Sequence, residues 1–483
     1  MPALKTKSSS IHVNTHIIIY MNKNFRNIAV AALAVSMLTG CNIYKKFELP
    51  KDSELAQQYA QAQEQPVDSA SFGNIDWHQV FTDPVLTDLI EQALANNTNL
   101  KNAMLNVDMA HASLKGARLS FLPSLALAPN GAGSKYGTGH GRSFGWSYTI
   151  PAQVSWEIDV FGKLLNNKRN AQAAYEQTQD YAQAVRSQII SATANTYYAI
   201  VALENQLKLS RTTAEKWREN VQVMKDFKEA GRVNEAAVVQ SNAQYYSILA
   251  SITDIEVSLD EMYNTLSLLL NTMPQKWSIS PDAVLEVPAM YRESVPMREL
   301  AARPDVRAAE RGLAAAYYAT AGARAAFYPG LNITANGGFT NLLGSMISNP
   351  GDFFIQLAGS LTIPLFSRGA NIARLEAAKA QQQQAMNTFE YTLMSASAEV
   401  SDAMTLYAKS GEKLDLLRVQ VENLEKSVEI TEELLSLGTS GTTYLEVLTA
   451  QQSLLAAQMN EITCENNRAR AVINLYQSLG GGR

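Results

Sequence analysis

The chain contains 483 residues but only two cysteines, Cys41 and Cys464. Cys41 ends an N-terminal segment that we expect to be an export signal, so Cys464 has no partner left for an intramolecular disulfide. The stability of the fold must therefore come from packing. Because Cys464 falls within a helical pattern, we expect a small buried side chain there rather than a reactive thiol.

Long apolar runs and an excess of basic residues are also missing. The apolar run from Ile28 to Leu38 has 11 residues, whereas a membrane-spanning helix needs roughly 20. Residues 1–40 contain four basic side chains and no acidic ones, which leaves 36 Lys and Arg against 45 Asp and Glu, a net charge of −9, in the remainder. The sequence contains no basic patch of the kind that binds nucleic acid. Without long apolar helices the chain is not expected to be a transport motor.

Signatures of catalysis are missing too. Of the five histidines, only His78, His111 and His140 lie outside the expected export signal, and they form no paired metal-ligand motif. There is no phosphate-binding glycine loop and no nucleophile elbow. Glu157 and Asp159 lie two residues apart on a predicted strand, and we interpret them as pore-lining residues rather than as a catalytic acid and base. We therefore expect no enzyme activity, no metal site and no cofactor.

The N-terminus indicates where the chain goes. Lys23 and Arg26 precede the apolar run, and the run leads into Leu-Thr-Gly-Cys at residues 38–41, an order typical of an export signal. This segment resembles the lipobox of bacterial lipoproteins, which implies cleavage before Cys41 and a covalent lipid on that residue. Asn42 in place of Asp favours the outer membrane. We expect residues 1–40 to be removed and the natural start to be Met21; an uncleaved anchor is the alternative.

The rest of the chain is duplicated with a period of about 206 residues. The repeat is visible in Phe121–Leu125 and Phe327–Leu331, in Ile158–Gly162 and Ile363–Ser367, and in Gly231 and Gly438. This period is too long for a stacked repeat array. The sequence therefore predicts two large halves of one architecture.

Each half contains very long helices. The stretch from Lys163 to Ala230 has no proline and carries an apolar seam that steps by four and three residues, the spacing of a coiled coil. At 1.5 Å per residue such a helix is about 100 Å long. Shorter helices from Asn234 to Asn271 and from Tyr444 to Leu479 are expected to return antiparallel, with hairpin tips at Gly231 and Gly438.

Between the helices the apolar period changes from 3.6 to 2. Every second residue from Tyr148 to Ile158 is apolar, and the segments Leu331–Ala335 and Phe353–Ile363 repeat the pattern. Such segments match a tilted transmembrane β-strand of about 9 to 11 residues, although a half-buried soluble sheet has the same pattern. Four strands per chain cannot close a barrel, so closure requires two chains for eight strands or three for twelve. Pro151 is expected at a bulge or at an edge.

Three segments carry a family resemblance: Trp77–Leu94, Ser155–Lys163, and Gly438 with Tyr444–Gln451. The chain resembles outer-membrane factors of the TolC and OprM type, in the lipoprotein branch called NodT-like. The resemblance implies a mainly α fold, with duplicated long helical hairpins and four strands per chain. As a homotrimer these strands would close a twelve-stranded barrel in the outer membrane, above a helical cylinder in the periplasm. It implies a passive gated duct that works with a periplasmic adaptor and an inner-membrane pump of RND type in an efflux system.

On this basis the expected organisation follows the repeats. It comprises a signal peptide at 1–40, a lipid-anchored equatorial segment at 41–82, a first repeat at 83–274 with a β-hairpin at about 124–160 and long helices at 163–271, a linker at 275–300, and a second repeat at 301–480 with a hairpin at about 330–365 and helices at 368–479. Outer-membrane lipids are the expected surroundings.

The resemblance also implies site residues. Contacts with the adaptor are expected at the helical tips, at Gly231, Arg232, Gly438, Thr439, Ser440 and Gly441, although turn geometry alone would explain the glycines. Glu446 and Thr449 match the periplasmic aperture, where three Glu446 side chains would favour cations; a solvated helical glutamate is the alternative. Trp156 and Phe161 suit an interfacial aromatic girdle, with core packing as the alternative.

A protein of another class would also carry a lipobox and rods. An outer-membrane-anchored coiled-coil tether or scaffold without a pore explains those two features. It does not explain why paired strand hairpins stand between the rods.

Overall fold

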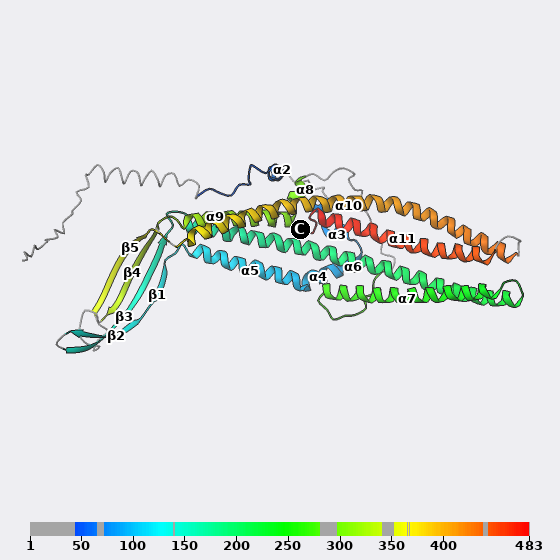
Figure 1. The fold of residues 1–483 in the computed structure, drawn as a ribbon, viewed down its shortest axis with the longest axis horizontal. Helices are drawn as coiled ribbons and strands as arrows, with labels where there is room; N and C mark the ends of the chain where they lie inside the picture. The colour runs from blue at the N-terminus through cyan, green and yellow to red at the C-terminus, as the bar shows by residue number, and fades with distance from the viewer. Residues whose placement is uncertain are drawn as a thin grey trace, which may run out of the picture.

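A computed structural model describes residues 44–64, 72–138, 141–280, 297–340, 352–364, 366, 368–437 and 443–482. The molecule is a long rod that carries a small sheet at one end and helical hairpin tips at the other (Figure 1). The expected signal peptide, Cys41 and residues 438–441 of the second tip lie outside the described residues. No helix in the described ranges combines the length and hydropathy needed to cross a membrane.

In the described part of the chain, six long helices occur as three pairs of equal length. The pairs are α5 (Thr98–Leu119) with α9 (Pro304–Ala325), α6 (Lys163–Glu229) with α10 (Ala370–Ser436), and α7 (Glu235–Leu269) with α11 (Tyr444–Ser478), of 22, 67 and 35 residues. This agreement confirms the duplication read from the sequence. The 67-residue helices are each about 100 Å long.

The ends of the long helices follow from local chemistry. Gly231 has a φ of 72° after α6, and the amide of Arg232 donates to the carbonyl of Phe227 at 2.8 Å, which is the Schellman arrangement. Asn271 (φ 55°) and Gly480 (φ 76°) end α7 and α11 in the same way. These backbone conformations explain why the predicted helix ends agree with the observed ones to within two residues.

The sheet has the strand order β1-β3-β4-β5, with β2 also paired to β3. Its strands are β1 (Ser124–Leu127), β2 (Asn130–Thr138), β3 (Gly141–Ile158), β4 (Gly330–Thr340) and β5 (Asp352–Thr362). All pairs are antiparallel, and β1 and β2 meet β3 in one continuous register. They act as a single interrupted strand, so each chain supplies four strands, as predicted.

Pro151 lies neither at an edge nor at a bulge, contrary to expectation. It sits within β3, where it pairs with Gly338 of β4 on one side and faces the gap between β1 and β2 on the other. The carbonyl of Pro151 accepts from the amide of Ala128 at 3.1 Å, so its nitrogen, which has no hydrogen, points toward the same neighbour. Ala128 and Pro129 form the gap between β1 and β2. The missing donor is therefore matched by an interruption of the facing strand rather than by a bulge.

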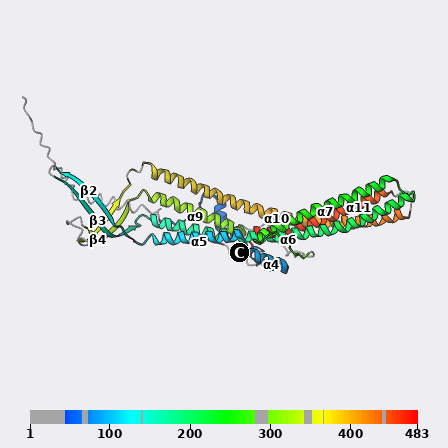
Figure 2. The same ribbon diagram turned by 90° about the horizontal axis from the view of Figure 1, so that it is seen from below.

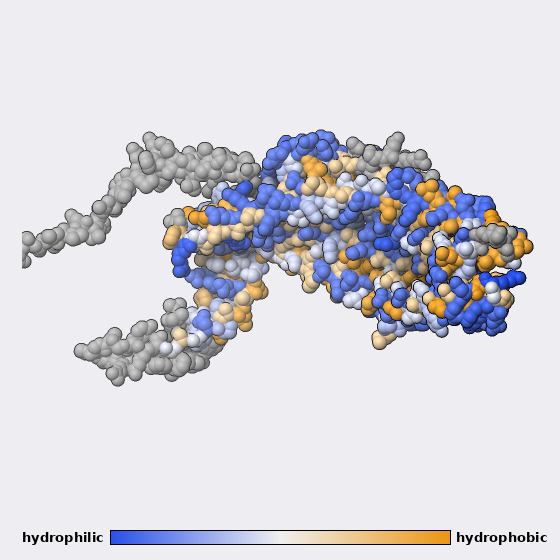
Figure 3. Space-filling model, turned by 45° about the vertical axis from the view of Figure 1, so that its right-hand side comes forward, coloured by the Kyte–Doolittle hydropathy of each residue, from blue (hydrophilic) through white to orange (hydrophobic). Residues whose placement is uncertain are grey.

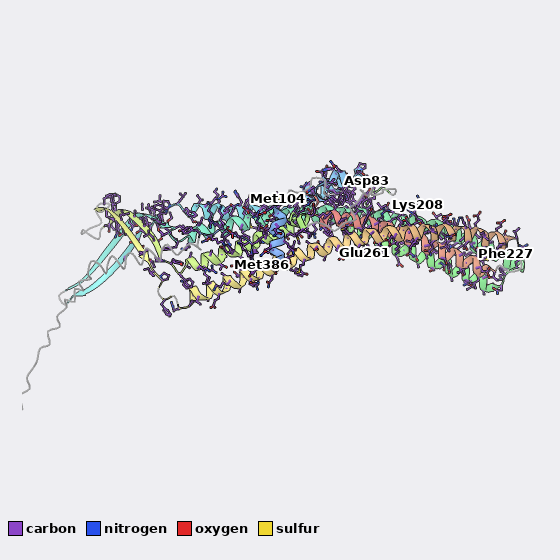
Figure 4. All side chains as sticks on the ribbon, turned by 90° about the horizontal axis from the view of Figure 1, so that it is seen from above. Asp83, Met104, Lys208, Phe227, Glu261 and Met386 are labelled. Atoms are coloured by element: carbon purple, nitrogen blue, oxygen red, sulfur yellow. The ribbon has the colours of Figure 1, made fainter. Side chains whose placement is uncertain are left out.

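The helices form one layer with two lateral edges. Near the sheet the neighbours run α5-α6-α9-α10, and toward the tips α7 packs on α6, α6 on α11 and α11 on α10. Figure 2 shows the two halves of this layer end to end. Exposed apolar side chains remain on both edge helices of the half nearer the sheet, the upper half: Met104, Leu105 and Met109 on α5, and Ile372, Tyr391 and Met394 on α10. Met104 projects from the rod in Figure 4.

Short helices cover the middle of the rod. They are α2 (Glu54–Gln63), α3 (Trp77–Val80), α4 (Pro84–Asn96) and α8 (Met297–Ala301), with a 3₁₀ turn at Phe72–Asn74. Buried Tyr59 of α2 packs edge-on against Phe389 of α10. Asp83, which Figure 4 labels, caps α4 and accepts a hydrogen bond from Tyr197 at 2.9 Å. The domain limits expected from the sequence stay a prediction.

Candidate functional site

The sheet has one apolar face that is open to its surroundings. Leu125 and Leu127 of β1 and Ile355 and Leu357 of β5 are each at least 70% exposed, and Figure 3 shows hydrophobic atoms on the described part of this sheet. In β3, Gln153, Ser155 and Glu157 alternate with the apolar side chains. Such alternation is typical of strands with lipid on one side and water on the other.

The outer edges of the sheet carry no further strand. Among the described residues, the interrupted strand β1/β2 pairs only with β3, and β5 pairs only with β4. Unpaired backbone donors and acceptors along an apolar sheet are costly, especially where water is absent. A single chain therefore presents an incomplete structure at this end.

The two predicted girdle aromatics lie where the sheet meets the helices. The indole nitrogen of Trp156 donates to the carbonyl of Phe121 at 3.0 Å. Phe161 stacks on Tyr328, with ring centroids 5.1 Å apart. Phe121 precedes β1 and Tyr328 precedes β4, so each aromatic ties the end of β3 to a different helix–strand junction. Their position at a membrane interface stays a prediction.

Asp159 has a local role that the sequence did not reveal. Its two carboxylate oxygens accept from the amides of Leu164 and Leu165 at 3.1 and 2.7 Å. The carboxylate thus satisfies free amides at the start of α6, where the helix dipole favours a negative charge. Glu157 instead pairs with Lys163 at 2.8 Å. The two carboxylates therefore do different structural jobs.

The first helical tip is a compact turn between α6 and α7. Nothing lies within 4 Å of a side chain added at Gly231, so its positive φ is what requires glycine. The guanidinium of Arg232 lies 5.6 Å from the ring centre of Phe227, close to the end of the rod in Figure 4. Lys228 pairs with Glu235 across the turn. Turn geometry accounts for Gly231, and the exposed Arg232 is free to contact a partner.

Glu446 and Thr449 lie in the first turns of α11, close to the second tip. A carboxylate oxygen of Glu446 accepts from the amide of Thr443 at 3.3 Å, which completes a capping box. The hydroxyl of Thr449 donates to the carbonyl of Leu445 at 2.8 Å. Glu446 therefore has a structural role whether or not it lines an aperture, and the aperture assignment stays a prediction.

A seam of polar contacts joins the two helical hairpins, and sequence analysis did not predict it. The hydroxyl of Tyr444 on α11 hydrogen-bonds that of Ser241 on α7, and both side chains are buried. Burial raises the pKa of Tyr444, and the bond to Ser241 opposes the shift. About two turns further along α11, Gln452 donates to Gln244 of α7 at 2.7 Å. These polar contacts thus connect one hairpin to the other.

A groove of about 730 Å³ opens near the tips between α6 and α10, with α11 as its floor. Apolar side chains form the base: Trp217, Met224, Val447 and Leu455. Glu425, Glu429 and Glu432 line the α10 wall, and Lys216 lies on the α6 wall. This combination of an apolar base and an acidic wall can accept an amphipathic helix that carries basic residues.

A network of charged side chains joins three helices of the second repeat at mid-length. Buried Arg303, which precedes α9, donates to the carbonyl of Ser478 at 2.6 Å and to Asp305 and Glu399 at 2.7 Å. Burial alone would lower the pKa of Arg303, but its bonds to the two carboxylates raise it overall. One guanidinium therefore connects α9, α10 and the end of α11.

The sequence matches a family model described as outer membrane efflux protein over residues 89–272 and 295–481. The chain belongs to the outer membrane efflux protein family. It is therefore an efflux channel of the outer membrane, and a tether without a pore is not favoured. The two matched stretches contain the two sets of long helices and strands described above.

Named relatives and solved structures agree with this family. The chain is 28% identical to the cation efflux system protein CusC of Escherichia coli, over 92% of this chain and 96% of that one, and 27% identical to the probable efflux pump outer membrane protein TtgC of Pseudomonas putida, over 96% of both. The structure is similar to that of CusC, with a TM-score of 0.77, 26% identity and coverage of 91% and 99%. It is also similar to the open state of the Neisseria gonorrhoeae MtrE outer membrane channel, with a TM-score of 0.74, 26% identity and coverage of 91% and 98%.

The relatives named above are efflux proteins and channels rather than enzymes. In the described ranges, no group of three or more His, Cys, Asp or Glu side chains is arranged to hold a metal ion.

Proposed function

We propose that three copies of this chain close into a gated passive duct across the outer membrane and the periplasm. The observation that carries the proposal is the open four-stranded sheet with its two unpaired edges. Joining β5 of one copy to β1/β2 of the next satisfies both edges, and three copies give twelve strands with room for a pore. This contact is heterologous and closes after three steps. In the upper half, the exposed apolar edges of α5 and α10 would meet in the same contact.

The duct operates as the outer component of a tripartite efflux system. The name of TtgC describes an outer membrane protein of an efflux pump and that of CusC a cation efflux system. For this chain we infer a periplasmic adaptor and an inner-membrane pump of RND type, which supplies the energy. The groove between α6 and α10 supports adaptor docking near the tips. We propose Gly231, Arg232 and residues 438–441 as further contact residues.

The aperture assignment can be tested without disturbing the helix cap. Glu446 is both a capping residue and the proposed source of negative potential. Because Gln also completes a capping box, Glu446→Gln should keep the fold and remove the charge. We expect lower cation selectivity of single channels in planar bilayers, by a factor of several, with unchanged thermal stability. Unchanged selectivity would remove Glu446 from the aperture.

The lipid on Cys41 is the only covalent group in the proposal. Changing Cys41 to Ser should abolish lipid labelling while leaving the helices intact. The expected mass of the lipidated N-terminus by mass spectrometry checks the modification directly, and an unmodified Cys41 would contradict it.

The decisive experiment is the mass and shape of the lipidated protein extracted in mild detergent. We expect a threefold hollow particle at least about 100 Å long, because α6 and α10 alone reach that length. A monomeric or dimeric solid rod, released without detergent once Cys41 is changed to Ser, would overturn the channel and favour the tether.

A further inference from the structure

Basic side chains gather where the helices meet the sheet. The helix ends and linkers at 112–123, 157–170, 322–330 and 366–376, together with 44–49, contain ten Lys and Arg residues against four Asp and Glu residues, a net charge of +6. The whole sequence has a net charge of −5. The positive charge at this level is therefore local and opposite in sign to that of the protein.

Contacts of Arg118 and Arg169, together with the sequence positions of Lys45, Lys46 and Lys115, bring five of these basic residues to one region beside the sheet. Arg169 of α6 donates to the carbonyls of Tyr44 and Lys45 at 3.0 and 3.3 Å and lies 5.7 Å from the ring centre of Tyr318. Arg118 of α5 bonds Gln172, one helical turn from Arg169, at 3.0 Å. Lys115 is one turn from Arg118 on α5, and Lys46 follows Lys45.

Arg324 extends this basic region onto α9. It lies seven residues after Tyr317, so the two share one side of the helix. Tyr317 contacts Phe47 of the N-terminal segment, with ring centroids 5.7 Å apart. The collar is therefore defined as Lys45, Lys46, Lys115, Arg118, Arg169 and Arg324. Glu48 is the only acidic residue in the N-terminal segment 44–49, and it pairs with Lys45 at 3.3 Å.

Helix capping does not explain the collar. Arg118 and Arg324 stand in the last turns of α5 and α9, where a cation is favourable to the helix dipole. Lys46 and Lys115 are at neither helix terminus. Among the described residues, no carboxylate lies within ion-pair distance of Lys46, Lys115 or Arg324, and all three side chains are exposed. They are available to an external anion.

The collar directly borders the apolar band of the sheet. Exposed Leu122 and Leu125 follow Arg118 along the chain, and partly exposed Phe327 and Tyr328 follow Arg324. Tyr44 donates to the carbonyl of Val160, just after β3, at 2.5 Å. Apolar side chains thus give way to basic ones within about two helical turns. In a membrane this is the change from hydrocarbon to headgroup.

We propose that the collar binds the phosphate groups of anionic phospholipids in the periplasmic leaflet of the outer membrane. The inference goes beyond the efflux activity and rests on the sheet lying in that membrane. Each Lys or Arg near an anionic surface strengthens attachment by about fivefold at moderate salt. The collar fixes the height of the rod relative to the bilayer, in addition to any lipid on Cys41.

The test compares two triple variants of the full-length protein in mild detergent. Lys115→Gln, Arg118→Gln and Arg324→Gln together remove half of the collar. Lys208→Gln, Lys225→Gln and Lys413→Gln remove the same charge from exposed positions on α6 and α10 far from the sheet; Figure 4 labels Lys208. Binding of phosphatidylglycerol and of phosphatidylcholine is measured by native mass spectrometry, which also reports the oligomeric state.

We expect the wild type and the control variant to prefer phosphatidylglycerol to phosphatidylcholine. In the collar variant, the ratio of the two affinities should fall by a factor on the order of 100 per chain. An equal preference in all three proteins would overturn the proposal. Salt-sensitive binding to isolated cell-wall sacculi that is lost in the collar variant, with lipid preference unchanged, would assign the collar to the cell wall instead. A mass other than that of a trimer would count against the proposed duct, independently of the lipid result.

Discussion

Replacing Arg303 by Met should destabilise the middle of the rod more than any change to its partners. Met keeps most of the aliphatic stem of Arg303, so the loss is confined to the guanidinium. That group is 6% exposed and holds the carbonyl of Ser478, Asp305 and Glu399. The carboxylates are 41% and 53% exposed and can be solvated by water after the change. The buried carbonyl of Ser478 loses its charged donor.

The expected cost follows from these exposures. A charge-assisted hydrogen bond contributes about 1.5–3 kcal/mol, and a buried carbonyl left without a partner costs about 1–3 kcal/mol. Half-exposed ion pairs add at most about 1 kcal/mol each. We therefore expect Arg303→Met to cost about 3 kcal/mol. Glu399→Gln should cost less than about 1 kcal/mol because it leaves the bond to Ser478 in place.

The assay is thermal and denaturant unfolding of the detergent-extracted protein, followed by circular dichroism of the helices. Arg303→Lys is the matched control, because it keeps the charge but cannot reach three partners with one planar group. It should fall between the wild type and Arg303→Met. If Arg303→Met is no less stable than Glu399→Gln, the argument that the buried carbonyl dominates is wrong.

Three further changes test other parts of the fold. Gly481→Ala should destabilise the packing of the C-terminal segment by about 1–3 kcal/mol, because its new methyl group would lie 2.5 Å from the buried ring of Tyr476. Gly116→Ala, whose new methyl group has no neighbour within 4 Å, should stabilise α5 by up to about 1 kcal/mol. Equal shifts in melting temperature for the two variants would contradict this. Ser241→Ala and Tyr444→Phe should each cost about 1–2 kcal/mol and the double variant less than their sum, so strict additivity in a double-mutant cycle would count against the bond. Gly231→Ala should cost about 1 kcal/mol and Gly231→Asn less, and loss of the difference would show that positive φ is not the constraint.

The helices could be predicted closely because their limits are set locally. Gly231 and Asn234 end and begin helices through backbone geometry and capping, and both signals are visible in the sequence. Asn271 agrees with this reading. It takes the same left-handed position after α7 that Gly231 takes after α6, and the expected helix end at Asn271 lies within two residues of the observed one.

Contacts between separate helices were beyond the reach of periodicity. The seam of α10 from Leu424 to Leu435 has the same spacing as the buried seam of α6, yet these side chains are only half buried, and two of them, Val428 and Leu435, border the groove. Spacing shows which face of a helix is apolar. It does not show whether the neighbouring helix comes close enough to cover that face or leaves a groove, as α6 and α10 do on either side of α11.

The collar was missed for the same physical reason, and this reason bears on its function. Its six basic residues come from the N-terminal segment and from α5, α6 and α9, and no stretch of the chain contains a basic run. In the duplicated architecture α5, α6, α9 and α10 all reach the level of the sheet (Figure 1), so isolated charges separated by up to about 280 residues arrive at one height on the rod. A flat membrane interface contacts all residues that lie at one height on the rod, whatever their order along the chain. A ring of scattered single charges can therefore position a channel in the bilayer without any linear motif that a sequence search would detect.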